Sequence, residues 1–149
     1  MTLLVDFDGV IGTEVKYTGP GSGRAFLATS SRDSAALRRM VDAGWAVVIV
    51  TASRSRLIEE YAQRHGAYCV ASRDKLFSML SVMDEEDIRG AVAIGDDISD
   101  IPMLKAAGRA FCPADAHPAL LKQFTPLKAA GGRGVIQEIE TLLKDDKVY

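Results

Sequence analysis

Two carboxylates stand two residues apart, directly after a short apolar run near the start of the chain. The run Leu3–Val5 is followed by Asp6, Phe7, Asp8 and Gly9. In an extended segment this spacing points both carboxylates to the same side, and Gly9 allows a sharp turn after them. Two close carboxylates repel each other unless a cation or a shared proton lies between them. A divalent cation would remove the repulsion, and Mg²⁺ suits a site with few carboxylates and open water positions.

Further polar residues follow later apolar runs in the same way. They are Thr51, Lys75 and Asp96, with Asp97 and Asp100 close behind the last of them. A hydroxyl, a fixed positive charge and a metal together match what a phosphoryl group requires. An ionised aspartate is then the natural nucleophile, because it can form an aspartyl-phosphate. The second aspartate of the first pair can protonate the departing oxygen and later take a proton from water.

These residues meet only if the apolar runs form one parallel sheet. Continuous apolar runs without polar alternation are typical of strands covered on both faces, and amphipathic segments alternate with them. This alternation predicts a three-layer, Rossmann-like α/β domain in which the carboxyl ends of the strands gather at one edge. The strands are expected at 3–5, 46–50, 68–70, 91–94 and 109–112, and the helices at 33 or 34 to 43, 55–65, 74–83, 100–107, 117–124 and 135–144.

Residues 12–28 interrupt the alternation. This stretch is rich in Gly and Thr and holds two β-like pieces, 15–17 and 25–27, around a turn at 18–23. We expect a short β-hairpin flap here. The intervals between Asp6 and Thr51 and between Thr51 and Lys75 leave no room for a cap domain. The chain is therefore predicted to be a single domain, 1–149, with a C-terminal tail and helix at about 128–149.

Composition excludes several classes of partner. The 149 residues carry 18 basic and 20 acidic side chains, a net charge of −2, which argues against a broad nucleic-acid footprint. The densest apolar run, 45–50, is far shorter than the roughly 20 residues of a membrane span, and the N-terminus has no signal-like segment. Cys69 and Cys112 have no CxxC partner, as expected of free thiols in a reducing compartment. We expect a cytoplasmic protein that binds neither nucleic acid nor membrane.

Four stretches resemble, in order, the motifs of the haloacid-dehalogenase-like (HAD-like) phosphatases: VDFDGV, VTAS, SRDKLFSML and IGDDISDIPML. The match covers nearly the whole chain. The resemblance implies a HAD-like fold and hydrolysis of phosphomonoesters through an aspartyl-phosphate. It assigns Asp6 as the nucleophile, Asp8 as the general acid and base, and Thr51 and Lys75 as phosphate ligands.

The same resemblance implies a metal cofactor. Mg²⁺ would be held by Asp6, the backbone carbonyl of Asp8, and Asp96, with Asp97 and Asp100 in support.

Two later stretches narrow the resemblance. ADAHPALLK, followed by KAAGGRG and a terminal helix, is similar to the capless subgroup that contains 3-deoxy-D-manno-octulosonate 8-phosphate phosphatase. This implies a homotetramer in which the flap and tail help to close a neighbouring subunit's site. It also implies a small phosphorylated sugar acid as substrate, with substrate contacts from Arg32, Ala52 and Arg133. A lone protomer would leave the reaction open to water, which weakens electrostatic stabilisation.

The chain departs from the subgroup at two places. Ala52 and Ser53 stand where the subgroup has Gly-Arg, or Gly-Glu in relatives that act on nine-carbon sialic-type sugars, and Arg54 comes one place later. Ser34 replaces a Gly after Arg32 and Asp33. Both departures fall where the sugar is expected to lie. The eight-carbon sugar acid 8-phosphate and the nine-carbon sugar 9-phosphate therefore both remain candidate substrates.

Two other classes of function are alternatives. A HAD-like scaffold without activity would keep the fold, although every reactive position holds a competent residue type. A phospho-accepting receiver domain shares the acidic residues, Thr and Lys, but there the phosphorylated Asp lies on a middle strand before the Thr and Lys. In this chain the second strand ends in Thr51, and the later acidic cluster follows Lys75.

Overall fold

A six-stranded parallel sheet forms the centre of the computed structural model, which describes residues 1–21 and 23–146. The strand order is β5-β4-β1-β6-β7-β8. The strands are β1 (Thr2–Val5), β4 (Ala46–Thr51), β5 (Tyr68–Ala71), β6 (Val92–Ile94), β7 (Arg109–Cys112) and β8 (Thr125–Pro126). All five predicted strands are present, and β8 is an addition. Its two residues pair with Phe111 and Cys112 and are too few to give a hydrophobic pattern in the sequence.

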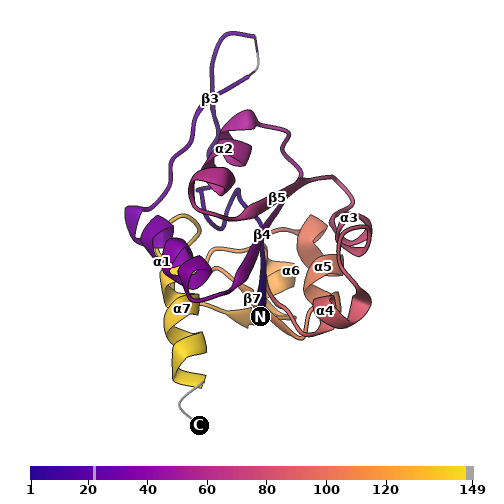
Figure 1. The fold of residues 1–149 in the computed structure, drawn as a ribbon. Coiled ribbons are helices and arrows are strands. Elements are labelled where there is room, and N and C mark those ends of the chain that lie inside the picture. Colours follow the sequence, from indigo (N-terminus) through magenta and orange to yellow (C-terminus); the bar gives the residue numbers. More distant parts are fainter. Residues whose placement is uncertain (22, 147–149) are drawn as a thin grey trace.

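Helices cover both faces of this sheet (Figure 1). One face packs against α1 (Ser31–Asp42), α2 (Arg56–Arg64) and α7 (Val135–Asp145). The other packs against α3 (Lys75–Leu80), α4 (Glu85–Arg89), α5 (Ile101–Ala106) and α6 (Pro118–Leu121). The predicted three-layer α/β fold is therefore confirmed. Among the residues described, no helix has the length and apolar character to cross a membrane.

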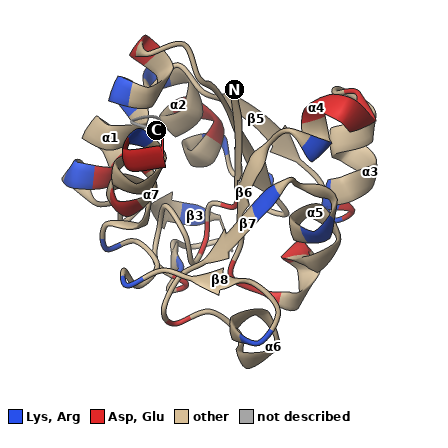
Figure 2. Cartoon of the chain, turned by 90° about the horizontal axis from the view of Figure 1, so that it is seen from below, with Lys and Arg blue, Asp and Glu red and all other residues tan. Residues whose placement is uncertain are grey.

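The outer helices carry basic and acidic residues interspersed with one another (Figure 2). The strands β1 and β6 are buried almost throughout, because each has a neighbouring strand on both edges and a helical layer on both faces. Their continuous apolar runs fit this position.

The start of α1 corrects one prediction. The sequence predicted Asp33 or Ser34 as the N-cap of this helix. The N-cap is instead Ser30, whose side chain accepts a hydrogen bond from the backbone N–H of Asp33. The fully buried Asp33 carboxylate instead accepts hydrogen bonds from the backbone N–H groups of Gly134 and Gln137 at the start of α7. Asp33 therefore joins the first and last helices, a contact between residues about 100 positions apart that local sequence patterns do not show.

Three predicted helices differ in extent from those in the structure. The helix expected at 74–83 ends at Leu80, and the separate helix α4 follows it. The helix expected at 100–107 begins as a 3₁₀ turn, Ile98–Asp100, before α5. The helix expected at 117–124 is limited to α6. Helix α4 was missed because Ile88 is its only apolar residue, so its sequence has no helical periodicity.

The predicted flap is present as an antiparallel hairpin of β2 (Tyr17–Thr18) and β3 (Arg24–Phe26). The hairpin projects beyond the sheet and its helices (Figure 1). The rings of Tyr17 and Phe26 stack across it with centroids 4.6 Å apart. The described residues between β1 and β4 form only this hairpin, α1 and their connections. Ser22 in the predicted turn and residues 147–149 of the predicted tail lie outside the described residues.

Candidate active site

The site is built at the carboxyl ends of three neighbouring strands. Asp6 directly follows β1, Thr51 ends β4, and Asp96 comes two residues after β6. Strand β1 lies between β4 and β6, so these three positions meet at one edge of the sheet, as the sequence predicted.

Lys75, the first residue of α3, enters the same site. Its Nζ lies 2.9 Å from Asp6 Oδ1 and 2.5 Å from Asp100 Oδ1, and its side chain is only 3% exposed. Asp6 Oδ1 also accepts a hydrogen bond from the backbone N–H of Phe7 at 2.7 Å. The second oxygen of Asp100 accepts hydrogen bonds from the backbone N–H groups of Asp96 and Asp97. The Lys75 ammonium group and three backbone N–H groups thus fix the orientation of the Asp6 and Asp100 carboxylates.

Asp6, Asp96 and Asp100 each offer a carboxylate oxygen, and these oxygens lie within 4.8 Å of one another. We call these three residues and Lys75 the strand-end cluster. An all-oxygen donor set of this kind fits a hard divalent cation such as Mg²⁺. The sequence assigned Asp100 only a supporting role. In the structure it is fully buried, contacts Lys75 and belongs to the acidic group, while its side chain does not cap α5.

The electrostatics of the cluster also favour a cation. Burial raises the pKa of Asp6 well above its usual value, and the charge of Asp100 raises it further, against the opposing effect of Lys75. Burial, with the charges of Asp100 and Asp97, raises the pKa of Asp96 to about 6. Burial lowers the pKa of Lys75, but the charges of Asp6 and Asp100 outweigh that effect, so its pKa is raised overall. One ammonium group does not balance three clustered carboxylates, and a divalent cation would.

Residues of the flap bind the Asp8 carboxylate. Its two carboxylate oxygens accept hydrogen bonds from Nη1 and Nη2 of Arg24 in β3, at 2.9 and 2.8 Å. Lys16 Nζ lies 3.8 Å from the same carboxylate. Sequence reasoning missed Arg24 and Lys16. The predicted hairpin already placed both residues near the start of the chain. The sequence did not show which face of the hairpin turns towards Asp8.

Thr51 is buried and shapes the loop that follows it. Its Oγ1 accepts a hydrogen bond from the backbone N–H of Ser53 at 3.0 Å. The next residue, Ala52, is exposed and lines a cavity of about 750 Å³ together with Arg54 and Arg73.

Glycines allow close approach on the other side of the cluster. A Cβ on Gly9, whose φ is 81°, would lie 1.8 Å from Asp96 Oδ2, so only glycine lets the loop after Asp8 pass this carboxylate. A Cβ on Gly131 would lie 2.0 Å from the carbonyl oxygen of Gly9, and Gly132 donates a hydrogen bond to the carbonyl of Val10. The C-terminal tail therefore packs on the loop of its own protomer that follows Asp8.

The remaining predicted residues lie further out. Arg32, in the first turn of α1, and Arg133, before α7, are exposed and form no ion pair with any residue in the described part of the chain. Asp97 is exposed as well, and its side chain caps the 3₁₀ turn through the backbone N–H of Ile98. The structure does not bring these three side chains into contact with the strand-end cluster.

This arrangement combines an oriented carboxylate, a buried ammonium group, an acidic group suited to a cation and a second carboxylate held by arginine. Phosphoryl transfer needs these parts: a nucleophile, positive charge for the equatorial oxygens and a proton carrier. A cavity of about 300 Å³ beside Gly9, Glu14 and Asp96 leaves room for ligands next to the acidic group.

Comparison with known proteins adds independent findings. No family profile matches the chain. A curated relative from Yersinia pestis, 3-deoxy-D-manno-octulosonate 8-phosphate phosphatase KdsC, is 32% identical over 154 residues, covering 98% of this chain and 81% of the relative.

Two solved structures show the same fold. The cobalt-bound deoxy-D-mannose-octulosonate 8-phosphate phosphatase from Haemophilus influenzae has a TM-score of 0.92 and 20% identity, covering 99% of this chain and 88% of that one. The enzyme from Moraxella catarrhalis, in complex with magnesium, phosphate and 3-deoxy-D-manno-octulosonate (KDO), has a TM-score of 0.87 and 18% identity, covering 97% and 85%.

Proposed function

Because the chain belongs to the 3-deoxy-D-manno-octulosonate 8-phosphate phosphatase family of HAD-like proteins and is a phosphatase, we propose that it is a Mg²⁺-dependent phosphomonoesterase that works through an aspartyl-phosphate. The observation that carries this proposal is the strand-end cluster. It combines a buried carboxylate fixed by Lys75 at 2.9 Å with two further carboxylates whose oxygens lie within 4.8 Å.

In the proposed reaction Asp6 is the nucleophile. Lys75 and the backbone N–H of Phe7 hold Oδ1 of this carboxylate and fix the plane in which it approaches phosphorus. The ammonium group of Lys75 and the hydroxyl of Thr51 bind the equatorial oxygens of the phosphoryl group, where charge gathers in the transition state. The phosphorus–oxygen bond to the leaving group breaks as the bond to Asp6 forms.

Asp8 moves the protons of both steps. In its protonated form Asp8 gives its proton to the oxygen of the leaving alcohol. The resulting carboxylate then takes a proton from the water that attacks phosphorus, the bond between phosphorus and Asp6 breaks, and the protonated acid is restored. Arg24 orients this carboxylate through two hydrogen bonds. Release of one of them frees an oxygen for the transfer.

Asp6, Asp96 and the backbone carbonyl of Asp8 would hold Mg²⁺, with the buried Asp100 beside them. Bound there, the ion would neutralise the phosphate dianion and lower the barrier to attack by a negatively charged carboxylate.

The substrate is proposed to be a small phosphorylated sugar acid. Relatives named for 3-deoxy-D-manno-octulosonate 8-phosphate and a neighbour solved with KDO support this class. Arg32, Ala52 and Arg133 are proposed to contact the sugar. All three are exposed, so their side chains are accessible to a bound substrate.

We extend the proposal to the setting of the enzyme. A homotetramer in which a neighbouring subunit covers the site would exclude water, since the described residues contribute only a narrow flap above it. The chain as a whole would act as one domain. Both cysteines, Cys69 and Cys112, are free thiols, which supports a reducing cytoplasm.

The test is hydrolysis of p-nitrophenyl phosphate with and without Mg²⁺, in the native protein and in Asp6→Asn. We expect Mg²⁺-dependent turnover that falls by at least about 10⁴-fold in the variant, because the nucleophile is lost. Asp42→Asn, at an exposed ion pair of α1, is the matched control and should retain full activity. Equal turnover in Asp6→Asn and the native protein would contradict the proposal.

A further inference from the structure

Residues 128–134 connect β8 to α7, and we call this segment the strap. Three carboxylates from outside the strap accept hydrogen bonds from its backbone N–H groups. The acceptors and their donors are Glu138 with Lys128 and Ala129, Asp115 with Gly131, and Asp33 with Gly134. These contacts fix the strap at both ends and in the middle, although its sequence is rich in glycine.

The strap lies directly on the loop after β1. A Cβ on Gly131 would lie 2.0 Å from the carbonyl oxygen of Gly9, and the backbone N–H of Gly132 donates a hydrogen bond to the carbonyl of Val10 at 2.8 Å. The same loop contacts the strand-end cluster, because a Cβ on Gly9 would lie 1.8 Å from Asp96 Oδ2. Strap, loop and Asp96 carboxylate are thus in successive contact, so a displacement of the strap displaces the loop relative to Asp96.

Asp115 connects the strap to the backbone of Asp96. It belongs to the stretch ADAHPALLK after β7, to which the proposed reaction gives no role. Its Oδ1 accepts a hydrogen bond from the backbone N–H of Gly131 at 2.9 Å. Two residues later, the backbone N–H of His117 donates to the backbone carbonyl of Asp96 at 2.8 Å. The loop after β7 therefore binds the strap through a side chain and Asp96 through its backbone.

The surroundings of Asp115 indicate how it acts. Asp115 is exposed and lines the cavity of about 300 Å³ together with Asp96. Its carboxylate is not one of the three whose oxygens lie within 4.8 Å of one another. Gly131 is buried, so the loss of the Asp115 acceptor would leave a buried N–H group without its partner. The hydrogen bond to the strap, rather than the charge of Asp115, is therefore the contact that reaches the cluster.

We propose that Asp115 is a positioning residue for the magnesium site. By holding Gly131 it keeps the strap on the loop after β1, so that the backbone carbonyl of Asp8 and the carboxylate of Asp96, which belong to different loops, are in place before the cation binds. This inference rests on the proposed function and adds to it a residue outside the ligand set. Residues that orient metal ligands from outside that set contribute about 10- to 100-fold to metal affinity.

Two substitutions of Asp115 separate its hydrogen bond from its charge. Asp115→Ala removes both, whereas Asp115→Asn keeps an oxygen that accepts the N–H of Gly131. In calorimetric titrations of the folded proteins with Mg²⁺, Kd should rise about 10- to 100-fold in Asp115→Ala and less than about threefold in Asp115→Asn. Asp42→Ala, at an exposed ion pair of α1, is the control and should keep the native Kd. An equal rise in both Asp115 variants, or a native Kd in Asp115→Ala, would overturn the proposal.

The Mg²⁺ concentration distinguishes positioning of the metal ligands from general support of the fold. Asp115→Ala should hydrolyse p-nitrophenyl phosphate slowly at a Mg²⁺ concentration that saturates the native protein. Its turnover should recover when Mg²⁺ is raised by about 10- to 100-fold, because the ligands themselves are intact. A deficit that persists at every Mg²⁺ concentration would contradict the positioning role.

Gly131→Ala tests the contact between strap and loop independently. The new Cβ would lie 2.0 Å from the carbonyl oxygen of Gly9, so the loop or the strap must move, and the Mg²⁺ Kd should rise about tenfold or more. Gly90→Ala is the matched control, since the nearest atom to its Cβ is the carbonyl oxygen of Glu86 at 3.5 Å. A folded Gly131→Ala protein with a native Kd would overturn the proposal. If Gly131→Ala does not fold, the two Asp115 variants decide.

Nuclear magnetic resonance of the metal-free protein separates this proposal from the proposed function. Asp115→Ala should shift the amide resonances of Gly9 and Asp96 and speed hydrogen exchange at Gly131 by about tenfold or more, whereas Asp115→Asn should change neither. If the native protein neither binds Mg²⁺ nor hydrolyses the ester while these changes occur, the proposed function fails and Asp115 still positions the loop. If Mg²⁺-dependent hydrolysis occurs and Asp115→Ala changes neither the Kd nor the resonances, the assignment of Asp115 fails alone.

Discussion

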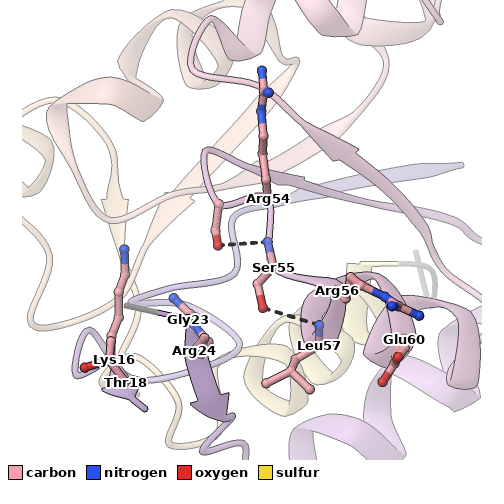
Figure 3. Close-up of a pocket in the computed structure, with 10 residues that line it drawn as sticks. Lys16, Thr18, Gly23, Arg24, Arg54, Ser55, Arg56, Leu57 and Glu60 are labelled. Carbon is pink, nitrogen blue, oxygen red and sulfur yellow. Dashed lines mark hydrogen bonds between the residues drawn. The ribbon is translucent and has the colours of Figure 1, made fainter. Parts of the chain in front are cut away.

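The strand-end cluster and the cavity of about 690 Å³ between the flap and the loop after β4, lined by Lys16, Arg24, Arg54 and Arg56 (Figure 3), are both charged regions of the candidate active site, but they are built differently. The cluster stands at the ends of buried strands, and Asp6 and Asp100 are held by backbone N–H groups and by Lys75. The cavity is lined by the projecting hairpin, the loop after β4 and the first turn of α2. Lys16 lies 3.8 Å from Asp8, and Arg54 and Arg56 form no ion pair with a described residue. Buried strands therefore position the proposed catalytic groups, whereas the basic residues of the cavity lie on the hairpin, a loop and the first turn of α2.

Among the variants that compare the two regions, the largest effect is expected from Lys75→Gln, which removes the buried cation of the cluster. Phosphatase activity should fall by about 10²- to 10³-fold, because Asp6 and the phosphate lose a charged partner. Without Mg²⁺ at neutral pH, the free energy of unfolding should fall by about 3–5 kcal/mol, since buried carboxylates are left uncompensated. Kinetics and urea unfolding measure the two effects.

Arg109→Gln removes the exposed ion pair with Asp146 and the contact of the guanidinium with the Phe111 ring. It is the control for Lys75→Gln and should lose about 1 kcal/mol or less. If the Lys75→Gln protein were as stable and as active as this control, Lys75 would not hold the carboxylates of the strand-end cluster in place.

The pH dependence of Mg²⁺ binding gives an effect of about tenfold per pH unit. The pKa of Asp96 is raised to about 6, so protons compete with the cation below that pH, and Mg²⁺ affinity should fall about tenfold per unit from pH 6 to pH 5. The stability of the metal-free protein changes with pH in the opposite direction. A raised carboxyl pKa stabilises the metal-free protein fully below the unfolded value near 4, and this contribution is lost as pH rises through about 6.

Calorimetric titration with Mg²⁺ from pH 5 to pH 8 measures the first effect, and thermal unfolding in EDTA over pH 4 to pH 7 measures the second. In Asp96→Asn the thermal stability of the metal-free protein should depend less on pH. A Mg²⁺ affinity that stays constant through pH 6 would contradict the assignment of Asp96 as a ligand.

A smaller effect, about tenfold, is expected from Arg24→Gln at the boundary between the two regions. The variant loses two charge-assisted hydrogen bonds to Asp8, so proton transfer to the leaving group becomes slower. The loss should be greater with sorbitol 6-phosphate, whose alkoxide must be protonated, than with p-nitrophenyl phosphate, whose leaving group needs no proton. Equal losses on the two substrates would mean that Arg24 does not act through Asp8.

The two regions also differ in how far the sequence predicts them. Asp6, Thr51 and Asp96 were placed correctly at one sheet edge, because continuous apolar runs identify buried parallel strands and each residue follows such a run. Arg24 was not found, because its partner Asp8 is 16 residues away across a flap whose register depends on tertiary contacts. Asp33 was misplaced for a similar reason, since its partners in α7 lie about 100 residues along the chain.

Trapping the covalent intermediate tests the central claim most directly. In Asp8→Asn the first step can still proceed with p-nitrophenyl phosphate, whose leaving group needs no proton, while the second step lacks its base. Rapid acid quench followed by peptide mass spectrometry should therefore find one phosphoryl group on Asp6, dependent on Mg²⁺ and absent from Asp6→Asn. A phosphoryl group on another residue, or none during measurable turnover, would contradict the assignment of Asp6 as the nucleophile of a strand-end magnesium site.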